Sequence, residues 1–110
     1  MAKTAYCEYI EELLSPYGDI KIKAMFGGYG IYMNGVIVGM IADDELYFKV
    51  DKSNQQQYED LDSEPFGYDK DGKIVKMSYW KIPLDILEDE EQLPKWLDQS
   101  YQISVKTKRK

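Results

Sequence analysis

Residues 25–35, with the sequence MFGGYGIYMNG, decide the fold of this chain. Three glycines fall within four residues, and an Asn-Gly pair follows between two apolar runs. Asn34 and Gly35 suit the positive φ angles of a type I′ turn, so the stretch predicts a β-hairpin. A further strand follows the acidic turn at residues 43–45. The pattern describes backbone shape and does not indicate a chemistry.

Hydrophobic periodicity extends this hairpin into a complete set of elements. Residues 4–14 place an apolar stripe at helical spacing, which predicts an amphipathic helix. Ser53 and Gln56 have the spacing of a capping box, which predicts the start of a short helix with Leu61 facing inward. The predicted order is a helix over 4–14, strands over 20–26, 29–33, 36–42 and 46–50, a helix over 53–61, strands over 65–68 and 74–82, and a helix from about Pro94.

This order predicts the α+β class, with an antiparallel sheet, the element order α-β4-α-β2-α and helices packed on the sheet. The 110 residues and 12.9 kDa suit one domain over 1–110, with a basic tail at 106–110. Apolar residues make up 44% of the chain, which is enough for an ordered core and argues against intrinsic disorder. We expect a single, soluble globular domain.

The overall charge argues against a surface that wraps nucleic acid without specificity. The net charge is −6 and the pI is about 4.6. No apolar run approaches the roughly 20 residues of a membrane span, and the first residues do not resemble a signal peptide. We therefore expect a cytoplasmic protein that makes no membrane contact. The basic tail is interpreted as a solvated C-terminus at the negative end of the last helix, with phosphate contact as the alternative, and consists of Lys106, Lys108, Arg109 and Lys110.

The residue inventory argues against an enzyme or a metalloprotein. The sequence has no histidine and one cysteine, so Ser-His pairs, Cys-His pairs and the common zinc ligand sets cannot form. Cys7 is interpreted as a packing residue of the first helix. Residues 69–72 resemble a calcium loop only superficially, because the glycine is at the wrong position, and a hairpin turn explains them. The acidic residues at 43–45 and 85–91 are interpreted as solvated. We expect no catalytic residue, metal or cofactor.

The glycine run at 27–30 does not have the pattern of a phosphate-binding loop. It lacks the G-x-G-x-x-G spacing and the G-K-[ST] ending, and a strand follows it rather than a helix. We interpret the glycines as permitting a bulge, a sharp bend or the close approach of a packed helix. A loop that contacts a ligand or partner is the alternative.

The chain carries, in order, MFGGYGIY at 25–32, Gly35, Asp43-Asp44, LYFKV at 46–50, MSYWKIP at 77–83, and Leu93 with Trp96. Together these motifs resemble the N-terminal domain of TfoX/Sxy proteins, regulators of natural competence. The resemblance spans roughly residues 5–105. It implies an α+β fold shared with secretion-chaperone-like domains, no catalytic residue, metal or cofactor, and a part in transcriptional activation of DNA-uptake genes together with the cyclic-AMP receptor protein. The longer members carry a second, helical domain, so this chain is expected to be a stand-alone N-terminal-like domain. The motif positions, which we expect to be structural, are Met25, Phe26, Gly27, Gly28, Gly30, Tyr32, Gly35, Leu46, Tyr47, Lys49, Tyr79, Pro83 and Trp96.

Tyrosines and lysines on the predicted strands form a candidate interaction face. If the polar faces of these strands coincide, the sheet presents aromatic and cationic side chains, a composition found at protein interfaces and at single-stranded nucleic-acid platforms. The alternative is that the aromatic rings lie under helices and the lysines extend at the rim. The residues of this candidate face are Lys21, Lys23, Tyr47, Lys49 and Lys76.

Three functions are compatible with these observations. The first is a non-enzymatic regulatory or protein-interaction domain, acting as a transcriptional co-regulator of natural competence genes, with the cyclic-AMP receptor protein as the partner that the resemblance implies. The second is direct DNA binding by the sheet face or the basic tail. The third is small-molecule binding in a pocket beneath the first helix. A homodimer through an edge strand or a helix face is also compatible with the sequence.

Overall fold

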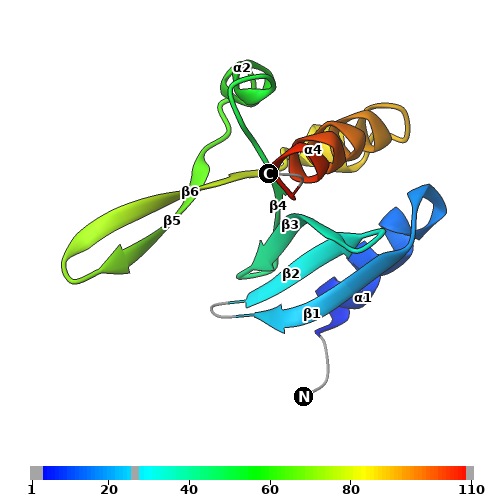
Figure 1. Cartoon of the computed structure of the whole chain (residues 1–110), viewed down its shortest axis with the longest axis horizontal. Coiled ribbons are helices and arrows are strands. Elements are labelled where there is room, and N and C mark those ends of the chain that lie inside the picture. Colours follow the sequence, from blue (N-terminus) through cyan, green and yellow to red (C-terminus); the bar gives the residue numbers. More distant parts are fainter. Residues whose placement is uncertain (1–3, 26–27, 109–110) are drawn as a thin grey trace.

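A single antiparallel sheet organises the chain, as Figure 1 shows for the computed structural model, which describes residues 4–25 and 28–108. The sheet has six strands in the order β1-β2-β3-β4-β6-β5. The α+β class is therefore confirmed. The strands are β1 (Ile20–Met25), β2 (Gly28–Met33), β3 (Val36–Ala42), β4 (Glu45–Lys49), β5 (Pro65–Lys70) and β6 (Lys73–Lys81).

Two-residue turns with positive φ angles connect the two strands in three hairpins. Asn34 and Gly35 have φ angles of 52° and 89°, as the Asn-Gly pair predicts. Asp71 and Gly72, with φ angles of 53° and 84°, form the equivalent turn between β5 and β6. This second hairpin extends away from the rest of the sheet in Figure 1, because β6 pairs with β4 only near its C-terminal end.

The helices begin and end at recognisable signals. The Thr4 side chain accepts a hydrogen bond from the Cys7 backbone and caps the first helix. Asp89 accepts hydrogen bonds from the backbone of Glu91 and Gln92 at the start of the last helix. The helical elements are α1 (Ala5–Leu14), the 3-10 turn η1 (Ser15–Tyr17), α2 (Gln55–Glu59), α3 (Leu84–Leu87) and α4 (Gln92–Lys108).

The predicted capping box before α2 is wrong. The Ser53 hydroxyl donates to Asp51 instead of capping the helix, and Gln56 donates to Asp60 rather than reaching back. The buried side chain of Asn54 accepts from the Asp51 backbone and donates to the Lys49 carbonyl, which fixes the path from β4 into the helix. Leu61 is 44% exposed and lies beyond the end of α2, so its predicted inward position is also wrong.

The two sides of the sheet carry two separate apolar clusters. The larger cluster combines strand residues such as Phe48 and Ile31 with Ile10 of α1, Tyr58 of α2 and Leu97 of α4. The smaller cluster centres on buried Met40, Ala42 and Tyr79, and it takes all of its members from strands. Within residues 4–25 and 28–108, the helices therefore contribute to the cluster on one side of the sheet only.

Two hydroxyl groups attach α4 to the sheet. Ser100 donates to the Lys49 carbonyl at 2.7 Å, and Ser104 donates to the Ile37 carbonyl. Both serines are buried, so their pairing removes the cost of an unsatisfied polar group beneath the helix.

Close approach of a neighbouring strand explains Gly28 and Gly39. A Cβ atom at Gly28 would lie 2.2 Å from the Ile41 carbonyl oxygen, and one at Gly39 would lie 2.3 Å from that of Tyr47. At Gly28 the close approach is made by the backbone of β3, not by the packed helix that the sequence analysis names among its interpretations. Phe26 and Gly27 lie outside the described residues.

Candidate interaction face and an adjacent pocket

The smaller apolar cluster has no member from a helix, and the side of the sheet that carries it is called the open face. Directly paired residues in antiparallel strands project to the same side, so the register defines this face. One row crosses β1, β2, β3, β4 and β6 and consists of Lys23, Gly30, Met40, Tyr47 and Lys81. The row next to it includes the pairs Lys21 with Tyr32 and Lys49 with Tyr79.

Lysines lie over aromatic rings on the open face. The ammonium nitrogen of Lys23 is 5.3 Å from the ring centre of Tyr32, and that of Lys49 is 5.1 Å from the ring centre of Tyr79. Such cation–π contacts hold the long lysine side chains near the sheet instead of leaving them free in solvent. Phe66 meets Tyr47 edge to face at 5.3 Å and extends the aromatic surface onto β5.

The structure places four of the five candidate face residues together. Lys21, Lys23, Tyr47 and Lys49 share the open face through the register described above. Lys76 does not join them, because it alternates along β6 with Met77 and Tyr79 of the open-face cluster and pairs with Gly67 in the extended part of the hairpin. Its inclusion is corrected by the register of β6.

Sequence reasoning missed Phe66, Met40 and Lys81 as members of this face. Met40 and Lys81 enter it through strand register, which requires the β4–β6 pairing of residues distant in the chain. Phe66 lies next to a register shift between Pro65 and Gly67, where simple alternation fails. The alternation of Met77, Tyr79 and Lys81 along β6 was a sequence signal for Lys81.

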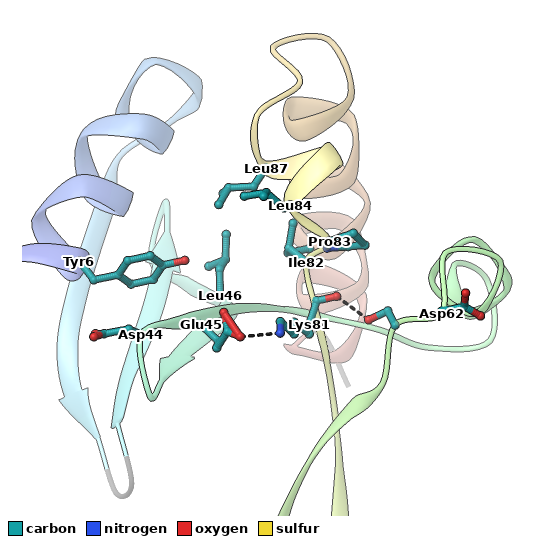
Figure 2. A pocket seen from close by; sticks show the side chains of 11 residues that line it. Tyr6, Asp44, Glu45, Leu46, Asp62, Lys81, Ile82, Pro83, Leu84 and Leu87 are labelled. Carbon is teal, nitrogen blue, oxygen red and sulfur yellow. Dashed lines mark hydrogen bonds and ion pairs between the residues drawn. The ribbon is translucent and has the colours of Figure 1, made fainter.

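A pocket of about 450 Å³ lies where β4 begins and β6 ends, and Figure 2 shows its lining. Its apolar floor is formed by buried Leu46, Ile82 and Leu87. Leu84, which is 63% exposed, lies at its rim. The remaining lining residues are Tyr6, Asp44, Glu45, Asp62, Ser63, Lys81 and Pro83.

Tyr6 reaches from α1 toward this pocket in Figure 2. Burial, followed by the nearby carboxylate of Glu45, raises the pKa of Tyr6 to about 12. The phenol is neutral at physiological pH, as an ordinary tyrosine is, and can both donate and accept a hydrogen bond.

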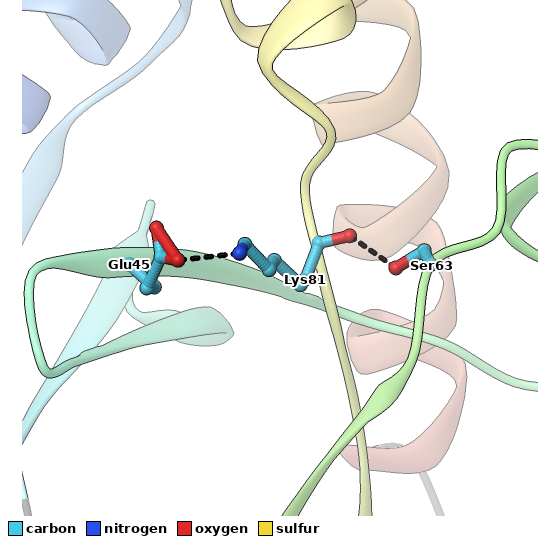
Figure 3. A network of polar contacts seen from close by, with 3 residues as sticks. All are labelled: Glu45, Ser63 and Lys81. Carbon is cyan, nitrogen blue, oxygen red and sulfur yellow. Dashed lines mark hydrogen bonds and ion pairs between the residues drawn. The ribbon is translucent and has the colours of Figure 1, made fainter.

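Lys81 joins two walls of the pocket, as Figure 3 shows. Its ammonium group pairs with Glu45 at 2.5 Å, and its carbonyl accepts a hydrogen bond from the Ser63 hydroxyl at 2.5 Å. The hydrogen bond to Glu45 raises the pKa of Lys81. Because both charged groups are well exposed, the pair orients the side chains more than it stabilises the fold.

Residues 4–25 and 28–108 contain no candidate metal centre and no candidate membrane-spanning helix. No group of three or more histidine, cysteine, aspartate or glutamate side chains is arranged to hold a metal ion there. Within the same residues, no helix combines the length and apolar character needed to cross a membrane.

Comparison with known families explains the order of the motifs. The TfoX N-terminal domain model matches residues 12–104, which is most of the chain. The chain belongs to the TfoX N-terminal domain family. Protein Sxy of Escherichia coli (strain K12) is similar to it, with 22% identity over 98 residues, 89% of this chain and 47% of that protein. The chain thus spans about half the length of this curated relative.

The TfoX motif positions occupy structural places where the chain is described. Leu46 is buried in the larger cluster, and Gly35 completes the turn between β2 and β3. Pro83 lies directly before α3, where its lack of a backbone N–H is tolerated. The Trp96 ring packs at 4.6 Å from the ring of buried Tyr58. Tyr32, Tyr47, Lys49 and Tyr79 instead lie on the open face, so these motif positions have a second role available.

Proposed function

We propose that this TfoX-family domain is a non-enzymatic regulatory domain that binds a protein partner through the open face. The observation that supports it best is the row of paired residues from Lys23 to Lys81, flanked by lysines over aromatic rings. Aromatic side chains with a few cations form the energetically dominant parts of many protein interfaces.

The charge of the open face supports a partner with acidic groups. Lys21, Lys23 and Lys49 lie together on a chain whose net charge is −6. A local positive surface on an acidic protein favours a partner patch of negative charge and disfavours self-association through the remaining surface. On the basis of the family, the proposed partner is a component of the transcription machinery, such as the cyclic-AMP receptor protein. The regulated genes are those of DNA uptake, and the domain acts in the cytoplasm.

A charge-reversal experiment tests this proposal. The variant carries Lys23→Glu and Lys49→Glu, and the control carries Lys95→Glu on the exposed side of α4. Pull-down from the native cytosol is expected to capture a transcription factor or RNA polymerase component with the unmodified domain and with the control, but not with the double variant. Equal capture by the double variant, or repeated failure of the folded bait, contradicts the proposal.

Direct DNA binding is the competing proposal, because the same lysines and rings suit a single-stranded nucleic-acid platform. Electrophoretic mobility assays at low and moderate salt separate the two. We expect no retardation of DNA at either salt. Retardation that falls steeply with salt and disappears in the double variant would assign the open face to nucleic acid instead.

A further inference from the structure

The outer part of β6 has an edge without a neighbouring strand. The pairing of β4 with β6 ends at Lys49, which lies opposite Tyr79. One further bond, from the Val50 N–H to the Ser78 carbonyl at 2.8 Å, lies just beyond this pair. From there to its turn, β6 runs beside β5 alone, and Figure 1 shows this hairpin standing clear of the other strands. Within the described residues, one edge of 73–77 therefore lacks a strand.

The backbone groups of Ile74 and Lys76 face this edge. At the other end of the strand, the Ile82 N–H donates to Leu46 of β4, whereas the Lys81 N–H donates to the chain on the β5 side. The direction of these groups alternates along a strand, so even-numbered residues of β6 face the side on which β4 lies. In the part of the chain that the structure describes, no strand pairs with Ile74 or Lys76 on that side.

The same edge carries an exposed apolar side chain. Ile74 is 68% exposed, and its neighbour across the hairpin is Asp69, an exposed turn-proximal residue that covers little of it. A two-stranded ribbon is marginally stable in water unless it packs against something else. Unpaired N–H and C=O groups beside an exposed apolar side chain are a template for adding a further strand.

A second copy of this edge fits the first in an antiparallel arrangement. With a twofold axis beside Ile74, the Ile74 residues of both copies lie directly opposite and exchange their backbone hydrogen bonds. Their exposed side chains then cover each other. In this register Lys76 lies opposite Gly72 of the second copy and Lys73 lies opposite Val75. No lysine faces a lysine, so the pairing avoids the repulsion of like charges.

The charge of the hairpin tip also favours a second copy. Residues 69–76 contain three lysines and two aspartates, a net charge of +1 on a chain whose net charge is −6. Two copies of an acidic protein repel each other through most of their surface, but the tips do not add to this repulsion. The antiparallel register also brings Lys76 of one copy near Asp71 of the other, because Asp71 precedes Gly72.

The outer edges of the two terminal strands of the sheet are less suited to self-pairing. In β1, the Asp19 carbonyl bonds toward β2, so the groups of Ile20 and Ile22 face outward. These two residues are only 8% and 3% exposed, which shows that this edge is covered. The outer edge of β5 begins at Pro65, which has no N–H, and a register shift follows directly.

We propose that two copies of this chain form a symmetric dimer by pairing residues 72–76 at the outer end of β6. The pairing makes a continuous ribbon of β5, β6, β6 and β5, with the body of each domain at an opposite end. Lys23 and Lys49 of the open face are not part of this pairing. The dimer therefore does not depend on the function proposed for the open face.

Sedimentation equilibrium of the full chain tests the proposal. From micromolar to millimolar concentration, the weight-average mass is expected to rise from that of one chain toward that of two. Ile74→Lys replaces the central apolar contact by two facing charges, so dimerisation is expected to weaken about tenfold or more. Leu84→Lys is the matched control, since Leu84 is 63% exposed on α3, and it is expected to dimerise like the unmodified chain.

Amide hydrogen exchange distinguishes strand pairing from association through side chains alone. At millimolar concentration, the Lys76 amide of the unmodified chain is expected to exchange severalfold more slowly than that of the Ile74→Lys variant. The Val75 amide faces β5 within one copy, so it is expected to be protected in both samples.

Three results would overturn the proposal. The first is a mass of one chain at millimolar concentration, and the second is an equal loss of dimer in Leu84→Lys. The third is a dimer whose Lys76 amide exchanges as fast as in Ile74→Lys, because the β6 edge would then not make the contact. The double variant Lys23→Glu and Lys49→Glu is expected to dimerise normally, so the results for the dimer and for the open face are read separately.

Discussion

At Gly39 a carbonyl oxygen of the neighbouring strand occupies the space that a side chain would need. The Cβ of any other residue would lie 2.3 Å from the Tyr47 oxygen and 3.0 Å from a ring carbon of Phe48. The backbone oxygen belongs to the β3–β4 pairing and cannot move without disturbing it. Glycine is therefore required here by space rather than by backbone angle.

Gly39→Ala is expected to destabilise the domain by about 1–3 kcal/mol, because the strands must separate or bend to admit the methyl group. The measurement is the free energy of unfolding in urea. Gly67→Ala serves as the control, since its Cβ would meet a flexible methyl of Ile74 at 3.1 Å in an exposed strand. If both variants lose the same stability, close strand approach is not the reason for Gly39.

Tyr6 gives the domain a dependence on alkaline pH. Its pKa is raised from 10.0 to about 12, so between these values the folded state holds a proton that the unfolded state has released. Stability from this group is complete below pH 10 and is lost as the pH rises toward 12. Tyr6→Phe is expected to reduce the loss over this range, measured by urea unfolding at several pH values. An unchanged slope would contradict the assignment, while an ultraviolet titration reports the missing phenol directly.

At the scale of elements, the start of α2 depends on one buried amide. Asn54 is 3% exposed and connects the Asp51 backbone with the Lys49 carbonyl. Hydrogen bonds that the Asp51 carboxylate accepts from the Ser53 hydroxyl and backbone N–H lower the pKa of Asp51. The turn, rather than a helix cap, sets the direction of the chain after β4.

Asn54→Ala is expected to cost about 1–3 kcal/mol of stability, because the Asp51 N–H loses its acceptor and the Lys49 carbonyl keeps only the Ser100 hydroxyl. Ser53→Ala is the comparison, with an expected cost below about 1 kcal/mol, since its contacts are exposed. Urea unfolding of both variants decides between the two residues. A larger loss at Ser53 would restore the capping interpretation.

Local sequence signals predicted the helices and strands well, but they predicted poorly which residues of different elements lie on the same face or in contact. Asn34-Gly35 fixes its hairpin through backbone angles, and the apolar stripe of α1 follows from spacing alone. The predicted capping box is wrong because the buried Asn54 side chain, rather than Ser53, bonds the backbone at Asp51 and Lys49. Lys76 was misplaced because its side of the sheet follows from the pairing between β4 and β6.

At the scale of the whole molecule, the sheet separates stability from the proposed binding. Phe48 and Lys49 are neighbours in β4, yet Phe48 is fully buried in the helix-covered cluster while Lys49 lies over Tyr79 on the open face. One side of each strand therefore carries most of the packing energy. The other side carries the groups proposed to meet a partner.

Phe48→Ala is expected to lose about 3–5 kcal/mol of stability, enough to unfold a marginal domain, because it leaves a cavity in the core. Lys49→Ala is expected to lose less than about 1 kcal/mol and to keep the native circular dichroism spectrum. Thermal and urea unfolding measure both. Comparable losses at the two positions would mean that the open face also supports the fold.

The sheet order has a consequence for biosynthesis. Strands β1 to β4 pair with one another in chain order, but the second pairing partner of β4 is β6, which is synthesised later. The apolar side of the first strands also packs against Leu93, Trp96 and Leu97 of α4, which are synthesised later still. A ribosome releases these partners last. The growing chain thus carries an apolar sheet face that only α1 and α2 can cover until its final third emerges. During this interval nascent molecules are most exposed to misassembly and to capture by chaperones.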